Sequence, residues 1–307
     1  MKISLIFPLY NEQDVIVFLQ KNINEWLLKQ KYDVEILVVN DGSTDSSLEK
    51  LRQWSTEDDR VKVLSFSRNF GHQAALTAGL DHAKGDVIVT MDADMQDPLV
   101  VVDKMIKKYE EGFDVVHSQR ISRSGESFLK KLTAWIFYRL FNMSSGNISL
   151  VDSGDFKLVS RKALNTLVTL REKHRFLRGM YCWIGFKNCV IPYNRNVRVA
   201  GITKFPYRKM FGFAWDALLS FSVLPIRLIS IIGFAIAGFG FMHATYSTIR
   251  YFIVGDNVQG WTTIIILQSL IGGFILISLG MIGEYIGRIY EEIKGRPIYV
   301  IDEKINF

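Results

Sequence analysis

Two long stretches without a formal charge, both near the C-terminal end, restrict what this chain can fold into more than any other feature. No Asp, Glu, Lys or Arg occurs from Leu228 through Ile249, or again from Asn257 through Gly283. About 20 apolar residues in a helix cross roughly 30 Å of hydrocarbon, and both stretches are long enough. Both also contain several glycines, as packed membrane helices often do. We therefore predict two transmembrane helices; the alternative is two helices buried in a soluble core.

Basic residues flank these stretches unevenly. The connection between them holds only Arg250 and Asp256, whereas both outer sides are basic: Lys204, Arg208, Lys209 and Arg227 before, and Arg288, Lys294 and Arg296 after. Because positive loops stay in the cytoplasm, both termini are predicted to be cytoplasmic. The N-terminal apolar run meets Pro8 too soon for a signal peptide. The expected boundaries are a cytoplasmic domain over 1–204, an interfacial region over 205–226, a transmembrane hairpin over 227–288 and a cytoplasmic tail over 289–307.

The net charge limits the kinds of binding partner to expect, and the two cysteines indicate the redox state of the thiols. A net charge of +6 suits a protein that lies on an anionic membrane face. No nucleic-acid-binding motif accompanies this charge, so nucleic acid is not expected as a partner. Cys182 and Cys189 lack a C-x-x-C spacing and are expected to be reduced structural thiols.

The N-terminal part alternates apolar strand-like runs with segments of helical spacing. The predicted strands are Lys2–Leu9, the run from Val34, Val61–Phe66, the run after Asp86, and Asp114–Ser118. Strands that alternate with helices in this way are typical of an α/β domain with a mainly parallel sheet.

The fourth of these strands ends in a turn rich in oxygen ligands. The apolar run Val87–Met91 is followed by Asp92, Asp94 and Gln96. Ligands of open α/β sheets bind beyond the C-terminal ends of the strands. Carboxylate and amide oxygens suit Mg²⁺ or Mn²⁺, which commonly takes its other ligands from water and phosphate. A diphosphate held by a metal is the resulting hypothesis, although an ordinary acidic loop has the same local pattern.

Two segments outside the strands are expected at the membrane surface. Apolar residues between Phe128 and Leu140 cover one arc of a helix, apart from Arg139, whose long stem allows it to reach lipid headgroups. The aromatic segment from Phe205 to Phe221 leads into the first apolar stretch. An ordinary core helix is the alternative for the first segment.

Six motifs in order carry a family resemblance. They are Pro8-Leu-Tyr-Asn-Glu12, Val39-Asn-Asp-Gly-Ser-Thr-Asp45, Arg68-Asn-Phe-Gly71, Asp92-Ala-Asp-Met-Gln-Asp-Pro98, Ser153-Gly-Asp-Phe156 and Gly283-Glu-Tyr-Ile-Gly-Arg288. Together they resemble family 2 glycosyltransferases of the polyprenyl-phosphate branch. The greatest similarity is to bactoprenol glycosyltransferases of the GtrB type, which are relatives of dolichyl-phosphate mannose synthase. The resemblance covers essentially the whole chain, including the two apolar stretches.

This resemblance implies a GT-A fold, which is Rossmann-like with a mainly parallel sheet. It also implies an inverting transfer of sugar from a nucleotide donor, UDP-glucose or UDP-N-acetylglucosamine, to undecaprenyl phosphate. The reaction would take place at the cytoplasmic face of a bacterial plasma membrane. The implied partners are a nucleotide sugar, undecaprenyl phosphate and membrane lipids, and a homo-oligomer stays open.

The resemblance also assigns roles to individual residues. The implied nucleotide-binding residues are Pro8, Tyr10, Glu12, Asp41 and Asp92. The implied ligands of Mg²⁺ or Mn²⁺ are Asp92, Asp94 and Gln96. The implied contacts of the acceptor phosphate are Arg120, Arg123 and Lys204.

Asp155 corresponds to the residue usually credited as catalytic base. A phosphate monoester with a second pKa near 6 is already mostly deprotonated at pH 7, so no proton has to be removed. Asp155 can instead orient the acceptor, hold Arg or Lys side chains, or stabilise positive charge at the anomeric carbon. An aspartate that caps a helix would look the same locally.

Three rival functions fit these sequence features less well. A non-catalytic nucleotide-binding scaffold would not need the complete set of acids. A lipid-translocation subunit would need ionisable groups inside the hairpin, where His243 stands alone and is expected to be a packed polar side chain. A processive polysaccharide synthase would need a Gln-x-x-Arg-Trp motif and more than two spans.

Overall fold

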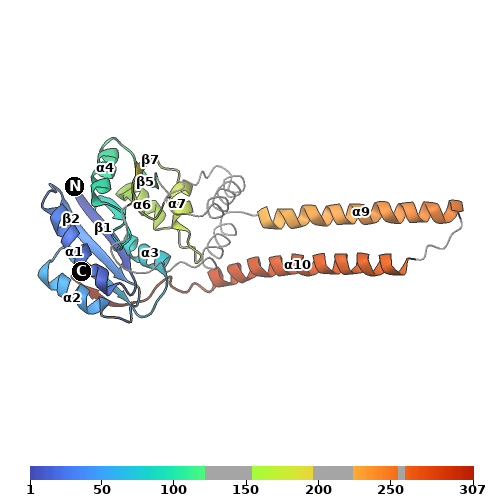
Figure 1. Cartoon of the computed structure of the whole chain (residues 1–307), viewed down its shortest axis with the longest axis horizontal. Coiled ribbons are helices and arrows are strands. Elements are labelled where there is room, and N and C mark those ends of the chain that lie inside the picture. Colours follow the sequence, from blue (N-terminus) through green and yellow to red (C-terminus); the bar gives the residue numbers. More distant parts are fainter. Residues whose placement is uncertain (122–153, 196–223, 255–259) are drawn as a thin grey trace. The chain divides into compact units, whose positions relative to one another are not determined.

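The computed structural model describes residues 1–121, 154–195, 224–254 and 260–307 (Figure 1). It divides into two compact units, Met1–Ala217 with Arg296–Phe307, and Leu218–Gly295. Arg123, Lys204 and both predicted interfacial segments lie outside the described residues.

An eight-stranded sheet, in the order β7-β5-β6-β4-β1-β2-β3-β8, forms the first unit. Its centre consists of four parallel strands: β1 (Lys2–Leu9), β2 (Asp33–Asn40), β3 (Val61–Phe66) and β4 (Val87–Thr90). These strands are apolar along most of their length because helices cover both faces of the sheet. The predicted α/β domain with a mainly parallel sheet is confirmed.

One side of the sheet contains an inserted antiparallel strand. Strand β6 (Lys157–Ser160) pairs antiparallel with both β4 and β5 (Val115–Arg120), and β5 pairs parallel with β7 (Asn188–Tyr193). Because β6 runs opposite to β4, its first residue lies beside the last residue of β4, with Thr90 opposite Lys157. The residues just before β6 therefore reach the same sheet edge as the residues just after β4.

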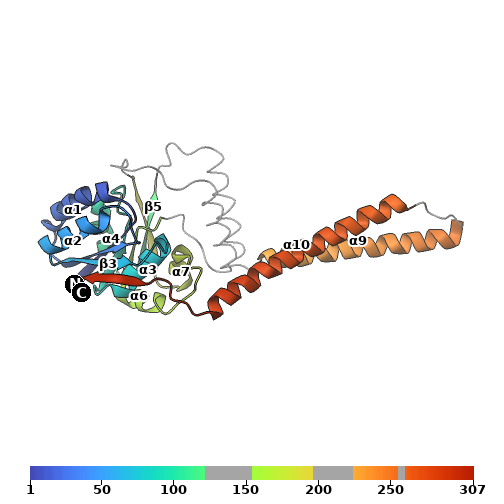
Figure 2. The same ribbon diagram turned by 90° about the horizontal axis from the view of Figure 1, so that it is seen from below.

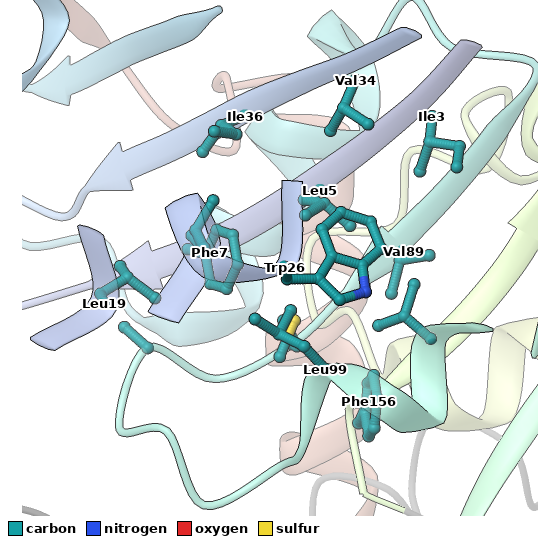
Figure 3. Packing of buried hydrophobic residues seen from close by; sticks show 14 of the residues in the cluster. Ile3, Leu5, Phe7, Leu19, Trp26, Val34, Ile36, Val89, Leu99 and Phe156 are labelled. Carbon is teal, nitrogen blue, oxygen red and sulfur yellow. The ribbon is translucent and has the colours of Figure 1, made fainter. Parts of the chain in front are cut away.

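Helices pack on the sheet through their buried apolar residues. They are α1 (Gln13–Leu27), α2 (Ser47–Glu57), α3 (His72–His82), α4 (Leu99–Glu110), α6 (Arg161–Leu167) and α7 (Leu177–Trp183). Figure 3 shows Trp26 of α1 beside Leu5 and Phe7 of β1, in one core that also includes Phe156. Burying such a side chain contributes about 1.5–3 kcal/mol. A Cβ at Gly79 would lie 2.3 Å from Ile6 Cγ2, so α3 packs closely against β1.

A strand at the C-terminal end of the chain completes the sheet. Strand β8 (Ile301–Ile305) pairs antiparallel with β3, and Figure 2 shows it in red beside that strand. The sequence predicted only a tail over 289–307. Here Ile301 and Ile305 flank three consecutive charged residues, and a run this short cannot be distinguished from a polar tail by its pattern.

The second unit consists of helices α9 (Leu224–Val254) and α10 (Trp261–Ile293). Two segments within them, Pro225–Arg250 and Leu270–Ile293, are long and apolar enough to cross a membrane. A Cβ at Gly233 would lie 3.1 Å from Phe274 Cε1, so the small residue allows α9 and α10 to approach each other there.

Candidate active site

The predicted site residues that the structure describes lie along one edge of the sheet. Asp41 follows β2, and Asp92, Asp94 and Gln96 follow β4. On the other side, Arg120 ends β5 and Asp155 precedes β6. Pro8 lies within β1, and Tyr10 and Glu12 follow that strand. Because β4, β1 and β2 are parallel neighbours, their C-terminal ends meet at this edge. The structure thus brings together the acids that the sequence places far apart.

The loops after β1 and β2 are joined by hydrogen bonds. The Asn11 backbone N–H donates to Ser43 Oγ at 2.9 Å, and the Asn11 side-chain oxygen accepts from the Thr44 N–H at 2.8 Å. Asn11 has a φ of 51°, a left-handed conformation that asparagine tolerates well. The Glu12 N–H donates to Ser47 Oγ at 3.1 Å. These bonds hold the segment that carries Tyr10, whose side chain is 39% exposed, close to the loop after β2.

The Asp41 carboxylate is buried and organises a third loop. It accepts hydrogen bonds from the backbone N–H of Phe70 at 2.7 Å, from that of Gly71 at 2.9 Å and from Asn69 Nδ2 at 3.0 Å. Burial raises the pKa of Asp41, although these bonds and nearby His72 oppose the rise. In this structure Asp41 holds residues 69–71 in place, and its contact with a nucleotide stays a prediction.

The turn after β4 is connected to the far side of the sheet by two arginines and a tyrosine. Arg195 follows β7, and its Nη2 lies 3.6 Å from Asp94 Oδ2. The Tyr193 hydroxyl donates to the buried Asp97 carboxylate, and Arg120 Nε donates to the Tyr193 oxygen at 3.3 Å. Burial, together with the charge of Asp92, raises the pKa of Asp97 to about 6. The predicted metal-binding turn therefore has a positive charge beside it.

Asp155 forms the centre of a charged cluster. Arg178 donates from Nε and Nη2 to its two carboxylate oxygens, each at 2.9 Å. His72 Nε2 lies 3.4 Å from Asp155 Oδ2 and 3.7 Å from Asp92 Oδ1. Burial alone would raise the pKa of Asp155, but the Arg178 guanidinium outweighs it and holds that pKa well below its usual range. Desolvation opposes a charge on His72, yet the two carboxylates outweigh it and raise the pKa of His72.

Comparison with known proteins identifies the family. Residues 4–168 match the model of glycosyl transferase family 2. The chain belongs to this family. The glycosyltransferase YkcC of Bacillus subtilis is 43% identical over 300 residues, which are 98% of this chain and 93% of that protein. The prophage-derived bactoprenol glucosyl transferase of Shigella flexneri is 39% identical over 301 residues, 98% of this chain and 97% of its own.

A solved structure of low identity supports the fold of this glycosyltransferase. Glucosyl-3-phosphoglycerate synthase from Mycobacterium tuberculosis, solved with Mn²⁺, UDP and glucosyl-3-phosphoglycerate, superposes with a TM-score of 0.50 at 18% identity. The match covers 72% of this chain and 80% of that one. The predictions of a GT-A fold and of a family 2 glycosyltransferase are confirmed.

The donor atoms of the glycosyltransferase suit a hard divalent cation. Within the described residues, no three His, Cys, Asp or Glu side chains converge as a metal-binding group. The turn after β4 instead offers the carboxylates of Asp92 and Asp94 and the amide oxygen of Gln96. This donor set fits Mg²⁺ or Mn²⁺ with water and phosphate as further ligands, and it does not form a cage of protein ligands alone.

Three basic residues beside the acids of the site have no role that the sequence predicts. His72 begins α3, Arg178 lies in α7, and Arg195 follows β7. The available signals were weak: His72 directly follows the Arg68–Gly71 motif, and Arg178 lies in a basic-aromatic segment. Their partners are tens of residues away in the chain, so no local pattern indicates which carboxylate each would meet.

Proposed function

We propose that this glycosyltransferase moves a sugar, glucose or N-acetylglucosamine, from a UDP-linked donor to undecaprenyl phosphate, with inversion at the anomeric carbon. The observation that carries the proposal is the meeting of two groups of side chains at one sheet edge. One is the oxygen-rich turn Asp92–Gln96, and the other is the cluster of Asp155, Arg178 and His72. The full-length similarity to a bactoprenol glucosyl transferase supports the lipid acceptor.

The donor would lie across the ends of β1, β2 and β4. Tyr10 and Glu12 would contact the nucleoside, beside the loop that Asp41 organises. Asp92, Asp94 and Gln96 would hold Mg²⁺ or Mn²⁺, which supplies charge neutralisation for the departing diphosphate. Arg195 is close enough to Asp94 to contact the same diphosphate. This arrangement directs the leaving group toward the turn after β4.

The acceptor phosphate would approach from the side of β5 and β6. Arg120 ends β5. A Cβ at Gly154 would lie 3.3 Å from Arg120 Nη2, so the glycine leaves room for the guanidinium beside the backbone that precedes Asp155. An arginine forms strong charge-assisted hydrogen bonds with a phosphate. Arg123 and Lys204, which the resemblance assigns to the acceptor, complete the proposed set.

Asp155 would act by position and charge in this scheme. Its two carboxylate oxygens accept from Arg178, and the low pKa keeps it ionised at neutral pH. The phosphate nucleophile is mostly dianionic at that pH and needs no base. The fixed negative charge of Asp155 would favour the positive charge that develops on the sugar ring during the displacement.

Helices α9 and α10 would anchor the enzyme where its acceptor is found. Their apolar segments are long enough for two spans, and the basic residues outside them favour cytoplasmic termini. The reaction would then occur at the cytoplasmic face of a bacterial plasma membrane, on a multi-pass protein.

The proposal is tested with the purified full-length protein in lipid nanodiscs. The protein is incubated with undecaprenyl phosphate and a panel of radiolabelled UDP-sugars, with Mn²⁺ or with EDTA. We expect one donor to label the lipid in the presence of Mn²⁺, and the product to have the opposite anomeric configuration by NMR. Transfer that survives both EDTA and Asp94→Ala would overturn the metal assignment. No transfer from any donor would overturn the proposed reaction.

A further inference from the structure

The C-terminal segment 296–307, which we name the strap, joins the sheet next to a loop of the candidate site. The strap follows α10 in the chain and includes β8, whose residue Ile301 pairs with Phe66 at the end of β3. The register shifts between Ser65 and Phe66, at the point where β3 leaves the sheet. The Ser67 N–H donates to the Val300 carbonyl at 3.1 Å. The strap thus hydrogen-bonds to the first residue of the loop that follows β3.

An aromatic stack connects the strap to this loop. The ring of Tyr299 stacks on Phe66 with centroids 5.2 Å apart and planes 10° apart. Phe66 in turn meets Phe70 edge to face, with centroids 5.7 Å apart. Aromatic pairs of these geometries stabilise each other beyond the burial of their apolar area. Phe70 therefore rests on a platform that the strap helps to build.

Phe70, the last ring of the stack, is connected to the Asp41 carboxylate through its backbone. The backbone N–H groups of Phe70 and Gly71 donate to Asp41, so the position of Phe70 determines where these two donors lie. His72, which lies between Asp92 and Asp155, is the next residue. A chain of direct contacts thus leads from Tyr299 to the nucleotide side of the site and to the start of α3.

A second set of contacts fixes Tyr299 itself. Its hydroxyl donates to Asp81 Oδ2 at 2.7 Å, and Arg171 Nη1 donates to the same oxygen at 2.7 Å. Ile298 and Ile301 pack beside it against the buried cluster of Phe66, Ala74 and neighbouring residues. A ring held on one face by a stack and at its hydroxyl by a nearly buried carboxylate has little freedom to move.

We propose that the strap positions residues 67–71 for the donor nucleotide, with Tyr299 as the positioning residue. The inference rests on the proposed function, because that function places a nucleotide beside the Asp41 loop. Tyr299 touches no substrate in this scheme; it acts through Phe66 and Phe70. The segment that follows the second apolar helix would therefore be part of the donor site and not a passive tail.

The test compares Tyr299→Ala with Phe307→Ala in the full-length protein. Phe307 packs on His82 at the other end of the strap, with ring centroids 5.8 Å apart, and serves as the matched control. Both variants shorten an aromatic side chain of the strap, but only Tyr299 contacts the stack. Hydrogen exchange of the Phe70 and Gly71 amides is measured without substrate, and KM is measured for donor and acceptor separately.

We expect Tyr299→Ala to accelerate exchange at both amides and to raise the donor KM by about tenfold, the equivalent of 1.4 kcal/mol. The acceptor KM should stay within about twofold, and Phe307→Ala should change neither the exchange of these amides nor the donor KM. Tyr299→Phe keeps the stack and should keep the wild-type donor KM. If Tyr299→Ala fails to fold, Tyr299→Leu, which keeps an apolar side chain but has no ring to stack on Phe66, is tested in its place, with the same expected changes in exchange and donor KM.

Each contrary outcome has a separate meaning. Unchanged exchange at Phe70 and Gly71 in Tyr299→Ala would overturn the strap as a positioning element. Accelerated exchange with an unchanged donor KM would overturn its link to the donor. The exchange measurement needs no substrate, so a wild-type protein that transfers no sugar counts against the proposed function alone.

Discussion

The Arg178 guanidinium donates one hydrogen bond to each carboxylate oxygen of Asp155, and both bonds are 2.9 Å long. This bidentate geometry occupies the carboxylate from the side of α7, and His72 Nε2 lies 3.4 Å from Asp155 Oδ2. A carboxylate held in this way is a poor proton acceptor, because its pKa is well below the usual range. The pair is better suited to present a fixed charge than to remove a proton.

Replacing Asp155 by Asn should reduce turnover much more than donor binding. The amide keeps the shape of the side chain but loses the negative charge that, in the proposed function, would face the sugar ring. We expect kcat to fall by about a hundredfold or more, with a donor KM within about threefold of wild type. Steady-state kinetics at saturating acceptor measure both. Arg178→Lys keeps the positive charge but cannot donate to both carboxylate oxygens in the same bidentate geometry. It should lower kcat less than Asp155→Asn does. Near wild-type turnover of Asp155→Asn would remove any essential role for this carboxylate.

Asp94 and Arg195 should affect metal binding in opposite directions. Asp94→Ala removes a proposed ligand and should abolish detectable Mn²⁺ binding and metal-dependent transfer. Arg195→Ala removes a positive charge 3.6 Å from Asp94 Oδ2 and should tighten Mn²⁺ binding severalfold in the absence of nucleotide. Electron paramagnetic resonance of free Mn²⁺ measures both affinities. Equal Mn²⁺ affinity in wild type and Asp94→Ala would contradict the ligand assignment.

Gly42 should be intolerant of any side chain. Its φ is 64°, and a Cβ there would lie 2.3 Å from the backbone carbon of Arg68. Gly42→Ala should cost about 3 kcal/mol or more, because the collision adds to the backbone strain, and should also raise the donor KM. Gly112→Ala is the control, since Gly112 has a φ of 88° and its nearest neighbour is the Lys187 side-chain nitrogen at 3.9 Å. Thermal unfolding should show a larger loss for Gly42→Ala, and a donor KM that only this variant changes.

Lys157 should make stability depend on pH in the alkaline range. Burial lowers the pKa of Lys157 to about 8 from 10.5, and its ammonium group lies 5.1 Å from the Tyr181 ring centroid. Below pH 8 both states are protonated, and the folded protein bears a penalty of about 3 kcal/mol. Between pH 8 and 10.5 the unfolded chain binds more protons, so stability rises with pH.

Lys157→Met is therefore expected to raise Tm at pH 7 by about 5 °C or more. The gain should shrink as the pH rises from 8 toward 10.5, where wild-type Lys157 is neutral in the folded state. Scanning fluorimetry over this range measures the difference, and the exposed Lys162→Met serves as the control with no such trend. A gain that is the same at every pH would show that packing, and not charge, explains it.

Local sequence patterns predicted the layout of the central sheet and the two apolar helices. Strand runs such as Lys2–Leu9, and helical spacings such as Val15 to Leu27, depend on neighbours within a few residues. The turn at Asp92 could be located in the same way, because a strand end and a following helix start are both local events. Strand β8 was missed because its pairing with β3 spans most of the chain and its own pattern is short.

What the sequence by itself determined is which acids stand at strand ends and which stretches are apolar enough for a membrane. The tertiary structure alone decided that Arg178 would hold Asp155, that His72 would lie between Asp155 and Asp92, and that Tyr299 would stack on Phe66. The physical reason is how far along the chain each kind of interaction acts. Hydrophobic periodicity and turn chemistry act between neighbours along the chain, whereas the pairing of a buried charge depends on which elements the completed sheet brings side by side.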